Sequence, residues 1–114
     1  MAERRPSEEP VFVMSVAARM VGVHPQTLRL YERMGLVSPG RVNNCEHGKR
    51  LYSEADIIRL QQIQRLTQEM GVNLAGVEVI LDLLERMEAM REEAEHELKR
   101  MQIEMEQLRR RRGP

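Results

Sequence analysis

Cysteine, aromatic residues and long hydrophobic runs are all scarce in this chain of 114 residues. A single cysteine excludes an internal disulfide and favours a reducing, cytoplasmic setting. The apolar runs are too short for a signal sequence or a membrane span, so we expect no membrane association. With two Tyr, one Phe and no Trp, the chain also lacks an aromatic platform for stacking single-stranded bases.

The chain also lacks the residue patterns of an active site. We find no nucleophile–base pair, no glycine-rich phosphate loop and no metal-ligand cluster, and therefore expect no enzyme activity, no cofactor and no metal. Cys45 and His47 are two candidate ligands where a closed zinc site needs four. Basic neighbours such as Lys49 favour an oxidisable thiol, so a redox role for Cys45 stays open.

Charge is present in abundance but is unevenly placed. The formal net charge is zero, yet residues 24–52 carry five basic and two acidic side chains. Residues 71–114 carry eight basic and ten acidic side chains. Because a local basic patch suffices to attract phosphates, the neutral total does not exclude a nucleic-acid partner.

Residues 18–33 have the pattern of two short helices joined by a tight turn. Ala18 lets another helix approach closely, Gly22 tolerates the backbone of a turn, and Pro25 suits the first turn of a second helix. The second helix carries polar and basic side chains that reach base edges and phosphates. The pattern predicts a DNA-reading helix-turn-helix, with an ordinary helical hairpin in a core as the alternative.

The polar, basic and tyrosine residues of this region form the predicted DNA-binding site. They are Ser15, His24, Gln26, Thr27, Arg29, Tyr31, Arg33, Arg41, Lys49, Arg50 and Tyr52. Several have alternative roles: Ser15 and His24 as helix caps, the two tyrosines as core residues, and Arg29 and Arg33 as ion-pair partners of acids such as Glu32.

A winged arrangement is predicted for the segments around this helix pair. Two short apolar runs around a turn-rich segment predict a basic β-hairpin over residues 36–52, and residues 11–14 read as a strand that joins it. Ser53 and Asp56 form a capping box for a further helix. That helix presents apolar residues every three positions and is expected to stop near Met70 and Gly71.

In the last part of the chain, positions separated alternately by three and four residues run in one register from Val77 to Leu108. All of them are apolar except Arg91. The pattern is typical of a coiled-coil seam and implies a partner chain. The predicted dimerisation residues are Leu84, Met87, Arg91, Ala94, Leu98, Met101, Met105 and Leu108. Arg91 and Ala94 form a weak centre, which lies close to the twofold axis if two chains pair antiparallel.

These segments predict a mainly α fold: a winged helix-turn-helix DNA-binding head with a small β-hairpin wing, followed by a long coiled-coil dimerisation helix. The expected divisions are a flexible arm over residues 1–10, the DNA-binding domain over 11–86 and the dimerisation helix over 87–114. A coiled-coil adaptor with a protein-binding head is the structural alternative, but it does not need the converging basic side chains of residues 29–50.

Residues 27–36, 50–53 and 56–57 are similar to the second helix and the strand-to-helix junction of the MerR superfamily of winged-helix regulators. Residues 24–29, 35–41 and 64–77 resemble its heat-shock repressor branch, HspR. The resemblance implies a homodimer on an inverted repeat of double-stranded DNA, with long helices joined antiparallel. It also implies repression of chaperone genes with the Hsp70 chaperone DnaK as co-repressor.

Two alternatives stay within the same superfamily. One is a regulator of another regulon, such as nitrogen metabolism. The other is a ligand-responsive activator, which we do not expect because no cysteine follows residue 45 and the chain ends at Pro114.

Overall fold

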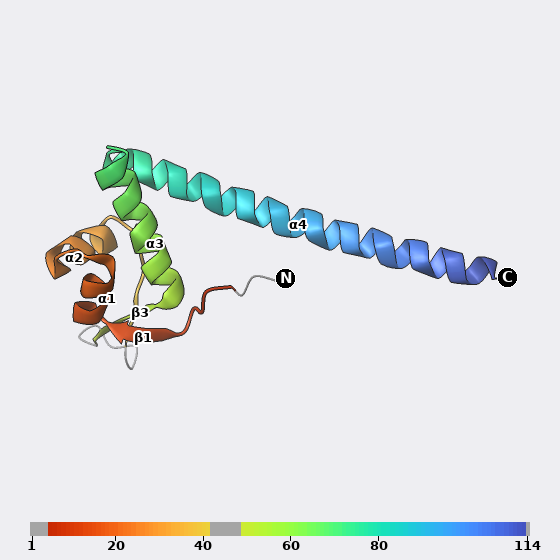
Figure 1. Ribbon diagram of the computed structural model, residues 1–114, viewed down its shortest axis with the longest axis horizontal. Helices are drawn as coiled ribbons and strands as arrows, with labels where there is room; N and C mark the ends of the chain where they lie inside the picture. Colours follow the sequence, from red (N-terminus) through yellow and green to blue (C-terminus); the bar gives the residue numbers. More distant parts are fainter. Residues whose placement is uncertain (1–4, 42–48, 114) are drawn as a thin grey trace. The chain divides into compact units, whose positions relative to one another are not determined.

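The computed structural model describes residues 5–41 and 49–113. Its elements in chain order (Figure 1) are β1 (Pro10–Val13), α1 (Met14–Val21), α2 (Pro25–Arg33), β2 (Gly40–Arg41), β3 (Arg50–Ser53), α3 (Glu54–Gln64), the π-helical turn η2 (Arg65–Glu69) and α4 (Leu74–Arg112). They form two compact units, Met1–Val77 and Glu78–Pro114. The mainly helical winged fold predicted from the sequence is confirmed, whereas the domain limits stay a prediction.

The wing is a three-stranded antiparallel sheet in the order β1-β3-β2. On one side of β3, Val13 lies opposite Leu51 and Phe12 opposite Tyr52, with an irregularity between Pro10 and Phe12. On the other side, β2 completes the predicted hairpin by pairing Gly40 with Leu51. Strand β1, near the start of the first unit, therefore joins the hairpin formed by β2 and β3, as the apolar residues 11–13 predict.

The predicted cap of α1 is wrong. Helix α1 begins at Met14, its N-cap is Val13, and no side chain makes a capping hydrogen bond there. Ser15 lies inside the first turn instead. The physical reason is strand pairing: β1 extends to Val13, so the chain enters the helix directly from the sheet, two residues too early for Ser15 to act as a cap.

Helix α3 begins with the capping box predicted from the sequence. The Asp56 backbone N–H donates to Ser53 Oγ over 3.0 Å, and the Ser53 backbone N–H donates to Asp56 Oδ2 over 2.9 Å. The helix ends in the wider turn η2, where Thr67 Oγ1 donates to the carbonyl of Ile63, four residues earlier, over 2.9 Å. Gly71, with φ of 67°, then ends the segment where the sequence predicts a stop.

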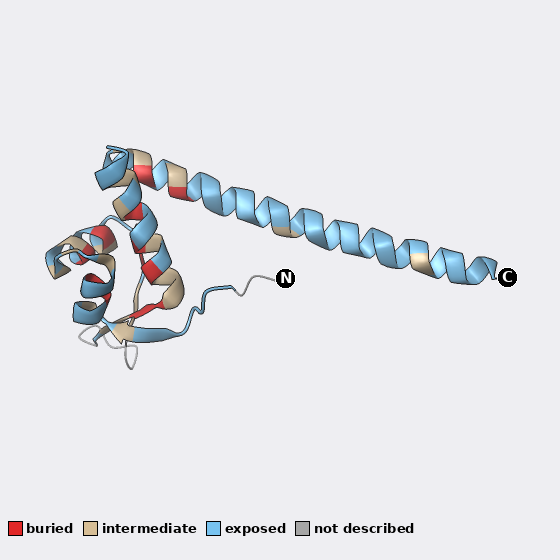
Figure 2. Ribbon diagram, viewed as in Figure 1, coloured by how far each residue is buried: buried red, intermediate tan, exposed pale blue. Residues whose placement is uncertain are grey.

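The core of the first unit lies between α1, α2, β3 and α3 (Figure 2). Its buried apolar residues are Ala17, Ala18, Leu28, Tyr31, Leu36, Val37, Tyr52, Ile57, Leu60, Ile63 and Val77. The residues of α3 in this list follow the spacing of three that the sequence predicts. The Arg59 guanidinium adds a hydrogen bond to the carbonyl of Leu36, which ties the segment after α2 to α3.

Helix α4 runs without a break for 39 residues. Its first turn is capped by Asn73, whose side-chain oxygen accepts from the backbone N–H of Gly76 over 2.8 Å. Beyond Leu81 the described residues of α4 are almost all exposed (Figure 2). Among the residues that the structure describes, no helix is long and apolar enough to cross a membrane.

Candidate nucleic-acid interface

The turn between α1 and α2 has the geometry that its sequence predicts. Gly22 adopts φ of 82°, and the backbone N–H groups of Gly22 and Val23 both donate to the carbonyl of Ala18, over 2.8 and 3.0 Å. This closes α1 in the manner of a Schellman motif. The first turn of α2 then starts at Pro25, where no backbone N–H is needed.

His24 is the cap of α2, which confirms the capping role considered from the sequence. Its side-chain Nδ1 accepts from the backbone N–H of Gln26 over 3.1 Å. Because the ring nitrogen is an acceptor here, this geometry requires a neutral imidazole with its proton on the other nitrogen. The cap fixes the direction in which α2 leaves the turn.

Helix α2 divides its residues between the core and the surface. Leu28 and Tyr31 are buried, whereas Gln26, Arg29 and Arg33 are exposed. The exposed three are spaced by three and four positions, so they share one face of the helix. Neither Arg29 nor Arg33 forms a salt bridge with another described residue, which leaves both guanidinium groups available for an external anion.

An ion pair links α2 to the wing. Arg50 Nε lies 2.5 Å from Glu32 Oε2, with the two side chains 33% and 19% exposed. The sequence places Arg50 among the predicted DNA-binding residues, and the structure gives it this second role as well. The pair joins residues 18 positions apart, so no local sequence pattern predicts it. It holds the first residue of β3 against α2, the second helix of the helix-turn-helix.

Three predicted DNA-binding residues meet at the base of the wing. Ser15, Lys49 and Arg50, together with Val13 and Met14, line one shallow groove where the β1–α1 junction faces the start of β3. A hydroxyl and two cations around one groove suit a phosphate group. Thr27, by contrast, is half-buried at the start of α2.

The two tyrosines of the predicted site are core residues in the structure. Tyr31 is buried, and its hydroxyl accepts from Gln64 Nε2 over 2.7 Å, which links α2 to α3. Tyr52 is completely buried, so its hydroxyl does not reach the surface as the sequence analysis allowed. Burial, with the negative charge of Glu32 as a second cause, raises the pKa of Tyr52 to about 12.

Some predicted positions fall outside what the structure describes. Cys45 and His47 lie there, and Arg41 is described only as a backbone residue of β2. Within residues 5–41 and 49–113, no group of three or more His, Cys, Asp or Glu side chains is arranged to hold a metal ion.

The predicted dimerisation residues form an exposed stripe on α4. Leu84, Met87, Leu98, Met101, Met105 and Leu108 are 43–68% exposed. Arg91, within the stripe, is held by Glu88 and Glu95 of its own helix. Hydrogen bonding to Glu88, together with the charges of Glu88 and Glu95, raises the pKa of Arg91. This side chain is therefore a permanent cation on an otherwise apolar stripe.

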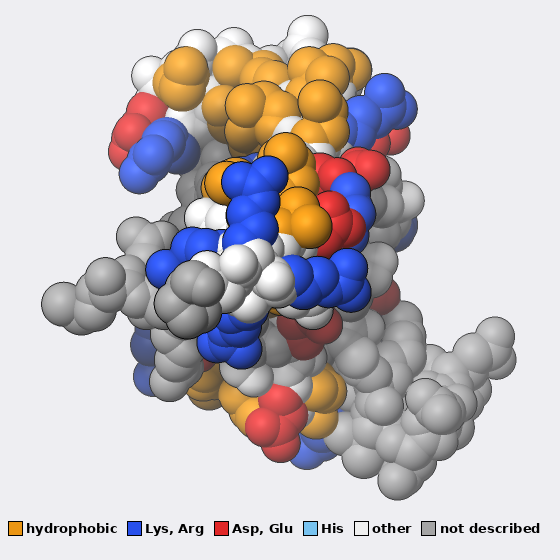
Figure 3. All heavy atoms as spheres, turned by 90° about the vertical axis from the view of Figure 1, so that its right-hand side faces the viewer, with side chains coloured by type: hydrophobic (Ala, Val, Ile, Leu, Met, Phe, Trp, Pro, Cys, Tyr) orange, Lys and Arg blue, Asp and Glu red, His pale blue; other side chains and the backbone are white. Residues whose placement is uncertain are grey.

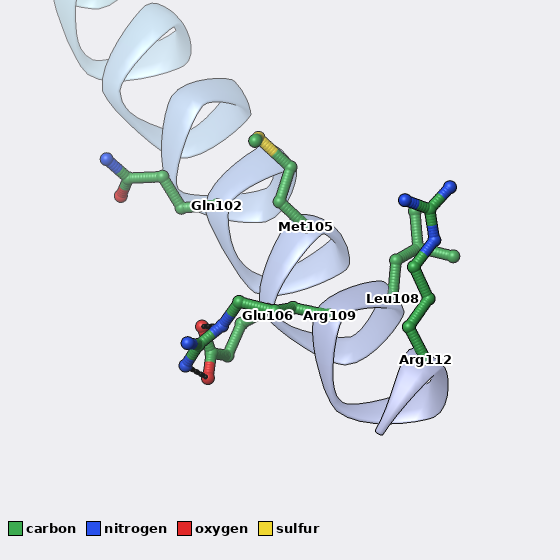
Figure 4. A pocket seen from close by; sticks show the side chains of 6 residues that line it. All are labelled: Gln102, Met105, Glu106, Leu108, Arg109 and Arg112. Atoms are coloured by element: carbon green, nitrogen blue, oxygen red, sulfur yellow. Dashed lines mark hydrogen bonds and ion pairs between the residues drawn. The ribbon is translucent and has the colours of Figure 1, made fainter. Parts of the chain in front are cut away.

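The end of α4 carries a groove and a basic cluster. Gln102, Met105, Glu106, Leu108, Arg109 and Arg112 line the groove (Figure 4). Because all of them belong to one helix, the groove is a surface furrow between side chains rather than an enclosed site. Four consecutive arginines, Arg109 to Arg112, make up the last turn, and basic side chains gather at this end of the molecule in Figure 3.

A short helix pair with a tight turn, a three-stranded wing and a following helix define a winged helix-turn-helix protein. The MerR HTH family of regulatory proteins matches residues 12–84, and the chain belongs to this family. The resemblance drawn from residues 27–57 is thereby confirmed. The two units of the structure are both represented in the match, which extends into the first turns of α4.

Proteins similar in sequence to this chain differ from it in length and from one another in name. A protein of Streptomyces coelicolor that bears the name heat shock protein HspR is 53% identical over 76 residues, which are 67% of this chain and 48% of that protein. The mercuric resistance operon regulatory protein of Bacillus cereus is 38% identical over 68% of this chain and 57% of its own length. The chain thus spans about half the length of these two relatives.

Solved structures share the fold. HiNmlR, a MerR family regulator that lacks the sensor domain, has a TM-score of 0.56 at 24% identity and covers 87% of this chain and 76% of its own. A MerR family transcriptional regulator from Bacillus cereus has a TM-score of 0.53 at 28% identity, covering 79% of this chain and 71% of its own.

Proposed function

We propose that the protein is a sequence-specific transcriptional repressor that binds an inverted-repeat operator in double-stranded DNA as a homodimer, and that it controls heat-shock and chaperone genes. The exposed face of α2 carries the DNA-binding part of the proposal, because Arg29 and Arg33 stand on it without a salt bridge to any described residue. The 53% identity to HspR of Streptomyces coelicolor supports the heat-shock part.

In this proposal, α2 enters a major groove. Arg29 suits a bidentate contact to the edge of a guanine, while Gln26 suits an adenine. At the wing, Lys49 and Ser15 would contact phosphates, which position the protein without reading sequence. The Arg50–Glu32 pair keeps the wing at a fixed place beside α2, so both surfaces meet one duplex together. HiNmlR, which shares the fold, was solved bound to promoter DNA.

The homodimer is supported by the exposed apolar stripe of α4. A single helix has no way to bury such a stripe, and two copies of the chain offer identical stripes to each other. Two heads joined in this way would read the two halves of an inverted repeat, because a twofold protein matches a twofold operator.

Recovery of bound fragments from sheared DNA of the source organism is the first test. We expect an inverted repeat upstream of chaperone genes. Fluorescence anisotropy on that repeat then compares Arg29→Ala with Arg86→Ala, a control on α4 that removes an exposed arginine paired with Asp82. Loss of one bidentate base contact weakens binding by about 1–3 kcal/mol, or roughly 5- to 150-fold, whereas the control retains full affinity.

Other outcomes reassign the function. A repeat upstream of nitrogen or metal-resistance genes keeps the DNA-binding homodimer but replaces the heat-shock regulon. Equal affinities of Arg29→Ala and the parent chain would contradict the placing of α2 in the groove. No enrichment of any sequence would contradict sequence-specific binding by the chain alone.

The co-repressor part of the proposal rests on the resemblance to the HspR branch. We expect purified DnaK to tighten binding to the recovered repeat and an unfolded client protein to reverse this effect. The measurement is the same anisotropy titration with and without chaperone. An unchanged titration would remove DnaK from the proposal and leave the DNA-binding part intact.

A further inference from the structure

Helix α4 contains two ion-pair groups with the same spacing of residues. In the first, Arg91 Nε donates to Glu88 Oε2 over 3.0 Å, and the same guanidinium contacts Glu95. In the second, Arg100 Nη1 lies 2.7 Å from Glu104 Oε1, and the same guanidinium contacts Glu97. Each arginine thus bridges the glutamates three residues before and four residues after it. The helix gains similar local support from both groups.

The two groups differ in the face of α4 that they occupy. Nine residues separate Arg91 from Arg100, and at 3.6 residues per turn this places them on opposite sides of the helix. Arg91 falls on the apolar stripe, and Arg100 falls on the outer face. Local helix stabilisation therefore accounts for Arg100, but it does not explain why a cation stands in the stripe.

Charge along α4 indicates which occupant the stripe accepts. Residues 74–88 carry four acidic side chains and one basic, a net charge of −3. Residues 97–112 carry three acidic and six basic side chains, a net charge of +3. A second copy of the chain that runs in the opposite direction places the acidic part of each α4 beside the basic part of the other. A parallel copy places like charges together.

Antiparallel pairing of the stripe still allows two registers, which differ by a slip of seven residues. The first register aligns Leu84 with Met101, Met87 with Leu98 and Arg91 with Ala94 of the second copy. The second aligns Leu84 with Leu108, Met87 with Met105, Arg91 with Met101 and Ala94 with Leu98. Both registers pair all the exposed apolar residues of the stripe, because the first also places Met105 opposite Ile80 and Leu108 opposite Val77. Apolar contact by itself therefore does not decide between them.

We propose that Arg91 and Ala94 together select the first register, in which each Arg91 lies opposite the Ala94 of a second copy. This inference rests on the proposed homodimer. The small Ala94 leaves room for the long stem of Arg91, so a large and a small side chain fill one layer. Glu88 and Glu95 are seven residues apart and lie on the same flank, where they hold the charged group at the edge of the stripe.

The second register is disfavoured by the same two residues. There Arg91 meets the flexible apolar Met101, which offers no partner to the guanidinium, and Ala94 meets Leu98 across an underfilled layer. A single polar residue in a coiled-coil seam is known to fix register at some cost in stability. Arg91 is thus a specificity-determining residue, and the register it selects sets the distance between the two DNA-binding heads.

Disulfide cross-linking of the full chain tests the register, with Cys45→Ser as the background. The first register brings the cysteines of Leu84→Cys/Met101→Cys together, and the second brings those of Leu84→Cys/Leu108→Cys together. A slip of seven residues moves the helices by about 10 Å, which is too far for a disulfide. Each pair is made with Arg91, with Arg91→Leu and with Arg100→Leu, the matched control on the outer face.

With Arg91 present, we expect the Leu84–Met101 cross-link and none between Leu84 and Leu108. In Arg91→Leu, the Leu84–Leu108 cross-link appears at the expense of the first, while Arg100→Leu keeps the parent pattern. An Arg91→Leu pattern identical to the parent would overturn the proposal. A Leu84–Leu108 cross-link in the parent chain would overturn it as well.

Two further measurements separate this proposal from the proposed homodimer. Leu84→Cys alone cross-links to itself only in a parallel pair, since the antiparallel registers place the two copies of this residue about 25 Å or more apart. Self-cross-linking would overturn the antiparallel registers but not the dimer. Sedimentation of the parent chain reports the dimer independently: a monomer would refute the homodimer itself, and a dimer without any cross-link would refute only the register proposal.

Discussion

The head, residues 5–77, and the rest of α4 use their apolar side chains in opposite ways. In the head, side chains such as Leu28 and Leu60 are completely buried. In the described residues beyond 77, Leu81 is the one buried apolar side chain, and Leu98 is 57% exposed. The head therefore has the core of an independent domain, whereas the stripe of α4 gains stability only when another surface covers it.

The largest expected effect comes from a cavity in the head. Leu60→Ala removes a completely buried side chain, and we expect the free energy of unfolding to fall by about 2–5 kcal/mol. Urea unfolding of the full chain measures this. The matched substitution Leu98→Ala on α4 changes an exposed residue, so at low protein concentration its effect stays within about 0.5 kcal/mol. Equal effects of the two substitutions at low concentration would contradict the comparison.

A middle-sized effect is expected at Tyr52, the completely buried tyrosine of the head. Its hydroxyl has no hydrogen-bond partner among the described residues, and an unpartnered buried hydroxyl costs about 1–3 kcal/mol. Tyr52→Phe keeps the ring and removes that group, so we expect a head that is more stable at pH 7 by about 1 kcal/mol. Thermal unfolding followed by circular dichroism measures the change. A loss of stability would mean that the hydroxyl has a partner.

We expect the same substitution to change how the free energy of unfolding depends on pH. The pKa of Tyr52 is raised from 10.0 to about 12 by burial, so the unfolded chain loses this proton first as the pH rises. Below pH 10 the pKa difference does not change the free energy of unfolding. Between about pH 10 and pH 12 that free energy falls by up to about 1.4 kcal/mol for each pH unit. Tyr52→Phe removes this alkaline loss. Parallel stability curves for the two chains over that range would contradict the raised pKa.

Local patterns predicted most of the backbone. Gly22 and Pro25 indicate the turn between α1 and α2 because each residue type has a conformation that the turn requires. The 3,4 spacing of apolar residues predicts the long helix, since a helix presents every third or fourth residue on one face. Where a local preference met strand pairing, as at Ser15, the pairing determined where the helix begins.

Contacts between distant residues were beyond the sequence patterns. The Arg50–Glu32 pair joins positions 18 apart, and the Gln64–Tyr31 hydrogen bond joins positions 33 apart. No periodicity reports which polar side chains meet once helices and strands pack. The complete burial of Tyr52 was equally beyond the sequence patterns, because it depends on how β3 lies against the helices of the head. The exposed residues of α2 were predictable because helical spacing alone places them on one face.

The smallest expected effect comes from the exposed one of two helix caps in the head. Ser53→Ala removes the cap of α3 inside the head, where Ser53 is buried and its hydroxyl accepts from Asp56 over 3.0 Å. We expect a loss of about 1 kcal/mol in the free energy of unfolding of the whole head, because α3 folds with its core. Asn73→Ala removes the exposed cap of α4, and there only the first turn frays. Hydrogen exchange distinguishes the two: Ser53→Ala accelerates exchange throughout the head, whereas Asn73→Ala accelerates it at Gly76 and its neighbours. Global acceleration in Asn73→Ala would show that the first turn of α4 unfolds only together with the rest of the head.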